Sequence, residues 1–381
     1  LTQLSCGNTQ LSALNVSKNT NLTYLYCSNN PFASFTTKDG HTLTVNQTAG
    51  GTVWTAEFTL NSNTITLTAK PDSGNSFQSW INPPDGAEQN GYEIRFKLTG
   101  NNTVEAAFIN TYTYDPGDVA AVNAIYDDNH LAEGTRNDPS TWTFVIWDNG
   151  SPKRITSLDL SGKSLSGTLD VGKLTELTDL NCSNTQLSAL EVSKNTNLTY
   201  LSCSNTQLSE LDVSKNTKLA ELYCYDTQLS ALDVSKNTLL AKLDCSDNQL
   251  SVLDVSKNTN LTYLFCDNTP LSALDLSKNT LLAKLYCYDT PLSALDVSKN
   301  TLLAQLLCSN TQLSALDLSK NTLLGILECS DNQLSALDLS KNTLLGILEC
   351  SDNPLTSFTP KVGHTLTVDK TTGGTVWMTA F

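Results

Sequence analysis

The sequence predicts a solenoid of roughly ten stacked coils, a helix that seals one end of it, and a separate small antiparallel β module. Two observations support this fold class. Cysteines recur every 21 residues, and leucines alternate with polar residues around each of them. A fixed period of this length indicates units that bury a common core only when they stack. The cysteines are Cys6, Cys27, Cys182, Cys203, Cys224, Cys245, Cys266, Cys287, Cys308, Cys329 and Cys350.

Residues 198–213 illustrate one coil. Leu201 and Cys203 alternate with polar neighbours, which is typical of a strand with one buried face. Leu211 and Val213 alternate in the same way, so the return side of the coil is also predicted to be extended. Stacking the coils then joins their strands into a continuous parallel sheet.

Aligned on the cysteine, the coils share the pattern L-x-x-L-x-C-x-x-(T/N)-x-L. This pattern resembles the leucine-rich repeat, with cysteine in place of the usual third leucine. The 21-residue form with its cysteine column resembles bacterial surface proteins of the internalin type. The likeness covers residues 1–35 and 154–358, where residues 154–169 form a first unit with Leu160 in the cysteine position. It implies an α+β/solenoid class: a right-handed solenoid with a parallel concave sheet and a mostly extended convex side.

The cysteines are expected to be reduced and buried. Parallel strands in register place neighbouring cysteines about 4.8 Å apart with parallel Cβ vectors. A disulfide needs Cβ atoms about 3.8 Å apart and a particular torsion, so a bridge would distort the sheet. A metal site is not expected, because no histidine or second cysteine lies at ligand spacing.

Residues 36–110 are rich in threonine and contain short alternating runs, which predicts a small antiparallel β module. The series from Leu67 to Trp80, ending in residues 104–108, resembles the divergent B-repeat found after leucine-rich repeats. That resemblance implies a β-grasp-like spacer in which Phe77 and Trp80 belong to the core. Residues 359–381 restart the same module, and Cys27–Cys350 and His41–His364 both span 323 residues. We therefore expect residues 1–35 to end a preceding solenoid, in a tandem array cut at both ends.

Residues 111–153 are expected to cap the main solenoid of residues 154–358. Asp115 can serve as an N-cap, and a helix over 118–131 would place Val119, Val122 and Tyr126 on one face. The segment resembles the N-terminal cap of extracellular leucine-rich repeats, without their paired cysteines. Its expected role is to cover the apolar end of the first coil.

Composition and motifs exclude several function classes. The net charge is −15 without any basic run, which disfavours nucleic acid or an anionic membrane as partner. No apolar run is long enough to span a membrane. No nucleophile elbow, phosphate-binding loop or metal constellation is present, so we expect no catalytic residue, no metal and no cofactor.

Aromatic and acidic residues gather at the outward positions of the central strands. Because tyrosine supplies contact area at a small entropic cost, the pattern fits a recognition surface. The alternative is that these rings only cover one another across stacked strands. The candidate ligand-binding residues on the concave face are Tyr200, Glu221, Tyr223, Tyr225, Asp244, Tyr263, Phe265, Asp267, Tyr286 and Tyr288. The carboxylates at their edge are Asp226, Asp247, Asp289, Asp331 and Asp352.

On the return side, Asp212-type and Lys215-type residues recur in almost every coil, and we expect the lysines to neutralise the carboxylates. The leading hypothesis is a non-catalytic, adhesin-like bacterial protein, extracellular or at the cell surface. Its partner would be a host or neighbouring-cell protein held on the concave sheet. The alternatives are a glycan bound by the tyrosine and carboxylate side chains, and a structural stalk.

Overall fold

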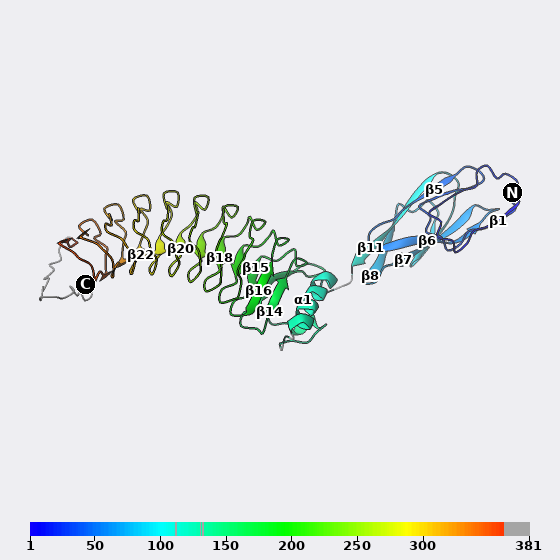
Figure 1. Ribbon diagram of the computed structural model, residues 1–381. Coiled ribbons are helices and arrows are strands. Elements are labelled where there is room, and N and C mark those ends of the chain that lie inside the picture. Colours follow the sequence, from blue (N-terminus) through cyan, green and yellow to red (C-terminus); the bar gives the residue numbers. More distant parts are fainter. Residues whose placement is uncertain (111–112, 130, 132, 362–381) are drawn as a thin grey trace. The chain divides into compact units, whose positions relative to one another are not determined.

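The chain divides into two compact units, each with its own hydrophobic core (Figure 1). The computed structural model describes residues 1–110, 113–129, 131 and 133–361. The first unit comprises Leu1–Asp115 with Gly150–Pro152, and the second comprises the remainder of the described chain. The β module expected at 359–381 lies outside the described residues from residue 362 onward.

The first unit is built from eleven strands in three sheets. The strands are β1 (Gln3–Ser5), β2 (Ala13–Asn15), β3 (Tyr24–Tyr26), β4 (Ser34–Thr36), β5 (Thr42–Asn46), β6 (Gly51–Thr59), β7 (Thr64–Pro71), β8 (Asn75–Ile81), β9 (Glu88–Asn90), β10 (Glu93–Lys97) and β11 (Asn102–Asn110). The sheet orders are β1-β3, β6-β7-β10-β9 and β2-β4-β5-β11-β8.

The short solenoid end and the β module share one core in this unit. Strand β4 pairs in parallel with β2 of the preceding coil and antiparallel with β5 of the module. Phe35 on β4 is buried and lies against Phe58, with ring centroids 4.7 Å apart. Trp80 is buried, and Phe77 packs against the core while remaining partly exposed. Residues 1–35 and 36–110 therefore form one compact unit.

The described residues of the second unit form a helix, a short 3-10 helix and fifteen strands. The helices are α1 (Pro116–Asn129) and η1 (Pro139–Thr141). The strands are β12 (Val145–Trp147), β13 (Ile155–Asp159), β14 (Ser166–Asp170), β15 (Asp179–Asn181), β16 (Gln186–Glu191), β17 (Tyr200–Ser202), β18 (Glu221–Tyr223), β19 (Lys242–Asp244), β20 (Tyr263–Phe265), β21 (Lys284–Tyr286), β22 (Gln305–Leu307), β23 (Ile326–Glu328), β24 (Ala336–Asp338), β25 (Ile347–Glu349) and β26 (Ser357–Thr359).

An eleven-stranded sheet runs through the whole solenoid, in the order β12-β13-β15-β17-β18-β19-β20-β21-β22-β23-β25. From β13 onward each strand pairs in parallel with the next, and the register holds equivalent residues side by side; Leu222, for example, pairs with Leu243. In Figure 1 these strands line the inner side of the arc formed by the coils. On the return side, the described part of this solenoid forms strands only near its two ends, as the pairs β14-β16 and β24-β26.

The cysteines form a buried, reduced ladder beneath the sheet. Each cysteine from Cys182 to Cys350 is buried, and no disulfide joins any of them. The backbone N–H of Cys224 donates to the carbonyl of Asp244 in the next coil at 2.8 Å, so the ladder continues the sheet's hydrogen bonding. Burial raises the pKa of the Cys224 thiol well above its ordinary value, and the neighbouring Cys203 adds a smaller effect in the same direction. The thiols therefore act as small apolar core groups.

Helix α1 covers the first coil. It begins two residues before the expected start at 118, and residue 130 of the expected helix lies outside the described residues. Val122 is fully buried in the same cluster as Leu158 and Leu160, and Val119 packs against that cluster. The helix also buries an acidic residue, Asp118, which the pattern of apolar positions did not suggest.

Two columns of asparagine and aspartate residues have backbone causes. Two residues after each cysteine the chain adopts a left-handed conformation, with φ of 53° at Asn205 and 50° at Asp226. Asparagine and aspartate tolerate this conformation better than other non-glycine residues. The carboxylates at Asp226 and its equivalents thus have a conformational reason to be where they are, independent of any ligand.

The second column is a ladder of buried asparagines on the return side. Its members are Asn195, Asn216, Asn237, Asn258, Asn279, Asn300, Asn321 and Asn342, and all are fully buried. The side-chain Nδ2 of Asn258 donates to the carbonyls of Val234 and Asn237, both at 2.9 Å. Each ladder residue in this way binds the coil before it.

Candidate recognition surface

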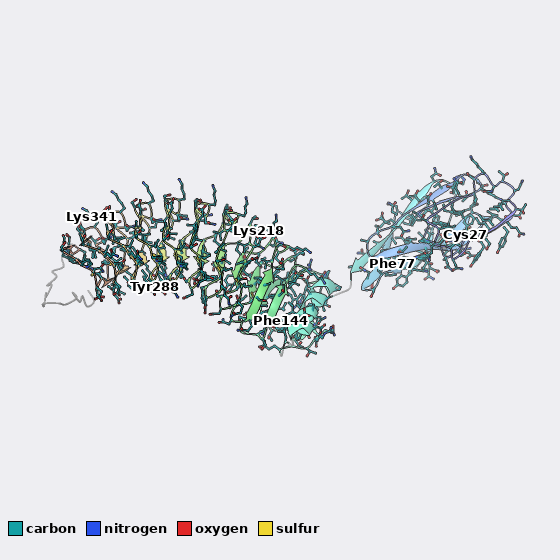
Figure 2. The ribbon with its side chains drawn as sticks, viewed as in Figure 1. Cys27, Phe77, Phe144, Lys218, Tyr288 and Lys341 are labelled. Atoms are coloured by element: carbon teal, nitrogen blue, oxygen red, sulfur yellow. The ribbon has the colours of Figure 1, made fainter. Side chains whose placement is uncertain are left out.

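The ten candidate ligand-binding residues, here called the concave strip, come from five neighbouring coils. Seven lie on strands β17 to β21, and the other three follow a strand directly after its cysteine: Tyr225, Asp267 and Tyr288. Residues of the strip alternate with buried leucines and cysteines, so their side chains point away from the core. Figure 2 shows Tyr288 on the inner side of the arc, whereas Lys218 and Lys341 lie on its outer side. The structure therefore brings the strip residues together on one surface.

The aromatic rings of the strip pack against one another. The rings of Phe265 and Tyr286 are stacked, with centroids 4.2 Å apart and an interplanar angle of 11°. Tyr200 and Tyr223 lie 5.6 Å apart in a tilted arrangement. The rings are consequently half-buried by their neighbours, and lateral packing holds their positions before any ligand arrives.

Charged groups in the centre of the strip are paired. Lys242 Nζ lies 2.9 Å from Glu221 Oε1, and the hydroxyl of Tyr223 donates to Glu221 Oε2 at 2.9 Å. Lys284 Nζ lies 5.0 Å from the ring centroid of Tyr263, where a cation–π contact is favourable. The lysines on either side of Tyr263 thus help to order a surface that is otherwise acidic.

Asp267 departs from the expected exposure, because only 5% of its surface is accessible. Its carboxylate accepts hydrogen bonds from Ser246 Oγ at 2.7 Å and from the side chain of Tyr288. Burial raises the pKa of Asp267, and these hydrogen bonds oppose the rise. Asp267 therefore positions the Tyr288 side chain and offers a ligand little surface of its own.

Asp244 is partly buried, and this raises the pKa of its carboxyl group to about 6. Burial is the main cause; nearby Asp267 and Asp247 contribute further, and hydrogen bonds from Ser246 oppose the shift. This places the titration of the carboxyl near neutral pH, well above the value of about 3.9 for an unfolded aspartate.

We expect Asp244 to make the unfolding free energy depend on pH near 6. Because its pKa is higher in the folded chain, the folded state binds the proton more tightly, and this contribution to stability is lost as pH rises through 6. Asp244→Asn should therefore gain stability relative to the unsubstituted protein between pH 4 and pH 7, as measured by chemical denaturation.

Asp212 supplies the control for this measurement. Hydrogen bonding from Ser214 lowers the pKa of Asp212, so the stability that Asp212 contributes is lost only as pH falls below about 4, and Asp212→Asn should change little relative to the unsubstituted protein between pH 5 and pH 7. If the unfolding free energies of Asp244→Asn and the unsubstituted protein differ by the same amount at every pH, the raised pKa of Asp244 is contradicted.

On the return side, each aspartate bonds first to its own turn, and the lysine three positions later acts on it through charge without an ion pair: Lys215 lowers the pKa of Asp212, after the larger effect of hydrogen bonds from Ser214. Asp212 Oδ1 accepts the backbone N–H of Ser214 at 2.8 Å, and the equivalent carboxylates repeat this local turn. No ion pair joins these aspartates to the lysine three positions later among the described residues. The physical reason is that the turn amide is close and fixed in direction, whereas an exposed lysine gains little by pairing.

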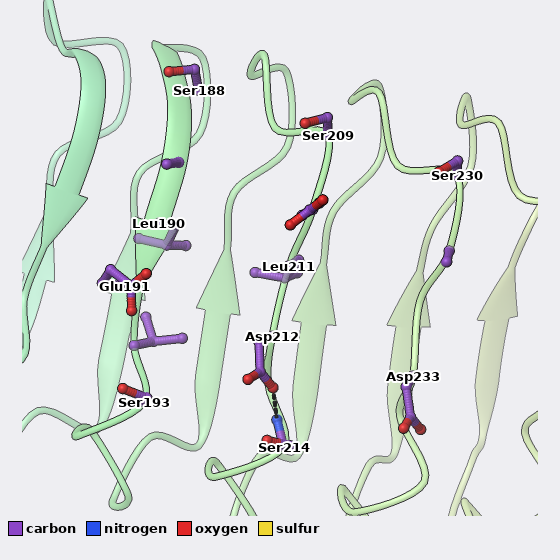
Figure 3. Close-up of a pocket in the computed structure, with 14 residues that line it drawn as sticks. Ser188, Leu190, Glu191, Ser193, Ser209, Leu211, Asp212, Ser214, Ser230 and Asp233 are labelled. Carbon is purple, nitrogen blue, oxygen red and sulfur yellow. Dashed lines mark hydrogen bonds between the residues drawn. The ribbon is translucent and has the colours of Figure 1, made fainter.

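A hollow of about 620 Å³ opens between the return segments of three coils (Figure 3). It is lined by serines, by the half-buried Leu211 and by carboxylates that include Glu210 and Asp233. In Figure 3 the carboxylate of Asp212 is turned toward Ser214, as the turn requires. The lining contains no histidine or cysteine, and we assign no chemistry to it.

Two negative observations concern the described residues. They contain no group of three or more histidine, cysteine, aspartate or glutamate side chains placed to hold a metal ion. They also contain no helix with the length and apolar character needed to cross a membrane.

Comparison with known proteins identifies both kinds of unit. The divergent InlB B-repeat domain family matches residues 41–112. The functional domain of InlJ from Listeria monocytogenes, which includes a cysteine ladder, is 43% identical, with a TM-score of 0.52. That match covers 53% of this chain and 45% of the InlJ chain, so this chain spans less than half of its relative. No curated protein sequence matches.

Two further solved structures match this chain at lower identity. An internalin (inlF) from Listeria monocytogenes is 20% identical over 65% of this chain and 82% of its own, with a TM-score of 0.45. The ectodomain of the Arabidopsis receptor kinase HAESA, solved with an IDA peptide hormone, is 19% identical over 62% and 53%, with a TM-score of 0.48. The chain is thus an internalin-like leucine-rich-repeat solenoid with a cysteine ladder and a B-repeat module, as the sequence predicted.

Proposed function

We propose that this chain is a non-catalytic recognition protein, secreted or held at a bacterial cell surface, that binds a protein ligand on the concave strip. The observation that carries this proposal is the strip itself, in which residues from five neighbouring coils form one continuous surface ordered by its own contacts. A surface that is already ordered loses little conformational entropy when a partner covers it. The likeness to the functional domain of InlJ supports the same role.

The domain division expected from the sequence forms part of this proposal. Residues 154–358 present the ligand-binding sheet, and residues 111–153 seal its first coil. Residues 36–110 act as a spacer that follows the solenoid end at 1–35. In this arrangement the spacer contributes no ligand contact, and specificity resides in the concave sheet of residues 154–358.

Glycan binding by the strip is the second candidate, and the ring geometry disfavours it. A saccharide stacks on a free aromatic face, whereas Phe265 and Tyr286 each cover one face of the other ring. Tyr200 is likewise half-buried beside Tyr223. A protein partner can instead use the ring edges and the surrounding polar groups over a broad area, on the order of 800 Å² for each partner.

Screening this chain against arrays of host proteins and glycans would identify the ligand, and alanine variants would then locate its site. Tyr225→Ala and Tyr288→Ala should each weaken binding by about 2 kcal/mol if these rings anchor the ligand. Tyr288→Phe keeps the ring and removes the hydroxyl that donates to Asp267, so it distinguishes the contribution of the ring from that of the hydrogen bond. Titration calorimetry would give the affinities.

The matched controls lie on the return side. Lys215→Ala and Lys236→Ala remove exposed side chains from that face and should leave the affinity unchanged. Tolerant tyrosines together with sensitive lysines would place the ligand on the convex side and refute the proposal. Selective capture of glycans by the unsubstituted chain would favour the second candidate.

A further inference from the structure

The concave sheet changes character in its last coils, beyond the concave strip. Residues 323–328 and 344–349 both read Leu-Leu-Gly-Ile-Leu-Glu, so two neighbouring coils present the same side chains. We call the outward residues here the aliphatic–glutamate patch: Leu307, Ile326, Glu328, Ile347 and Glu349. They lie on β22, β23 and β25.

The apolar members of the patch are open to solvent. Ile347 is 46% exposed and pairs in register with Ile326, which is half-buried. Leu307 is half-buried and pairs in register with Glu328. Isoleucine and leucine side chains gain free energy when such area is removed from water. The patch therefore has apolar surface that a partner can cover.

The two glutamates form an uncompensated pair. Glu328 and Glu349 are directly opposite each other on parallel strands, which places their Cα atoms about 4.8 Å apart on the same face. Burial raises the pKa of Glu328, and the charge of Glu349 raises it further by a smaller effect. Among the described residues neither carboxylate forms an ion pair, whereas Glu221 in the concave strip is neutralised by Lys242.

Two glycines lie in the sheet close to this pair of glutamates. Gly325 and Gly346 occupy the position that Ala283 and Ala304 hold in the preceding coils. A Cβ added at Gly325 would approach no atom closer than the carbonyl oxygen of Ala304 at 3.7 Å, which is an ordinary contact. The fold therefore does not require glycine at this position. Its effect is to leave the backbone accessible next to Ile326, where a partner can approach closely.

We propose that the aliphatic–glutamate patch binds a cationic segment of the protein ligand, in which an arginine or lysine lies next to an aliphatic residue. This inference rests on the proposed function and adds the chemistry of the partner. The cation would lie between the carboxylates of Glu328 and Glu349 and relieve their repulsion. The aliphatic residue would cover Ile326 and Ile347, with the partner's backbone over the two glycines.

The test is selection of peptides from a displayed random library on the immobilised unsubstituted chain. Enriched peptides should carry arginine or lysine beside an aliphatic residue. Their affinity should fall at least tenfold for Glu328→Gln/Glu349→Gln, which keeps the side-chain shape. It should also fall for Gly325→Ala/Gly346→Ala, which restores the residue found in earlier coils. Glu210→Gln on the return side is the control and should have no effect.

The outcomes separate this inference from the proposed function. Peptides that are acidic or neutral, or that bind the Glu328→Gln/Glu349→Gln variant as well as the unsubstituted chain, would overturn the cationic-segment assignment. If such peptides still lose affinity on Tyr225→Ala/Tyr288→Ala, the concave strip remains the binding surface. Peptides sensitive only to Lys215→Ala or Lys236→Ala would overturn both. Unchanged melting temperatures would show that each variant is folded.

Discussion

Asp118→Ala is expected to lower the free energy of unfolding of the second unit by about 3 kcal/mol or more. Asp118 lies on helix α1, and its side chain is fully buried facing the start of strand β13. Its carboxylate accepts hydrogen bonds from Arg154 Nε and Nη2, both at 3.0 Å. It also accepts one from the backbone N–H of Ile155 at 2.8 Å. Removing it leaves a partly buried guanidinium and a buried amide without this acceptor, which is the costly way to break an ion pair.

Denaturation followed by tryptophan fluorescence measures this effect, because Trp142 is buried against Tyr126 of helix α1. The control is Asp127→Ala on the same helix, which removes an exposed ion pair with Arg136, a residue that follows the helix. Exposed pairs contribute little, so this variant should unfold like the unsubstituted protein. Equal effects of the two substitutions would mean that the buried pair does not hold the cap in place.

Asn258→Ala should destabilise the solenoid by about 1–3 kcal/mol. The side chain is fully buried, and its Nδ2 satisfies two carbonyls of the preceding coil, those of Val234 and Asn237. Alanine would remove both of these bonds and leave each carbonyl with its backbone donor alone, the N–H of Asn237 for Val234 and the N–H of Leu240 for Asn237. Because stability in a solenoid comes largely from contacts between neighbouring coils, the loss should act on the central part of the array.

Asn260→Ala is the matched control for this substitution. Asn260 lies two residues along the same turn, where its Nδ2 donates to the carbonyl of Thr238 at 3.1 Å in an exposed position. Water can replace that bond, so denaturation should show little change. A small effect of Asn258→Ala would indicate that water reaches the carbonyls and that the ladder is dispensable.

The sequence predicted the solenoid well because its period fixes the register. Once Leu201 and Cys203 are placed on one face, the 21-residue repeat determines which residues lie beside them in every coil. The outward positions of Tyr223 and Tyr286 follow from the same parity. The buried asparagines were also within reach, because Asn258 and its equivalents recur unchanged in the sequence Ser-Lys-Asn-Thr.

Contacts between distant residues could not be predicted in this way. Asp118 lies on a helix and meets Arg154, which is 36 residues away, and no local pattern indicates that pairing. The burial of Asp267 depends on Ser246 and Tyr288, which belong to the coils on either side. In the sequence, Asp118 and Asp267 look the same as aspartates that are exposed to solvent. Their environments follow from side-chain packing that a periodicity argument does not describe.

The central claim is that a protein ligand contacts the concave strip, and site-specific photo-crosslinking tests it most directly. A photoreactive phenylalanine derivative placed at position 225 or 288 keeps an aromatic ring there, and one at position 236 probes the return side. With the ligand found by array screening, we predict adducts from positions 225 and 288 and none from position 236. Adducts from position 236 alone would contradict the account and move the ligand to the convex face.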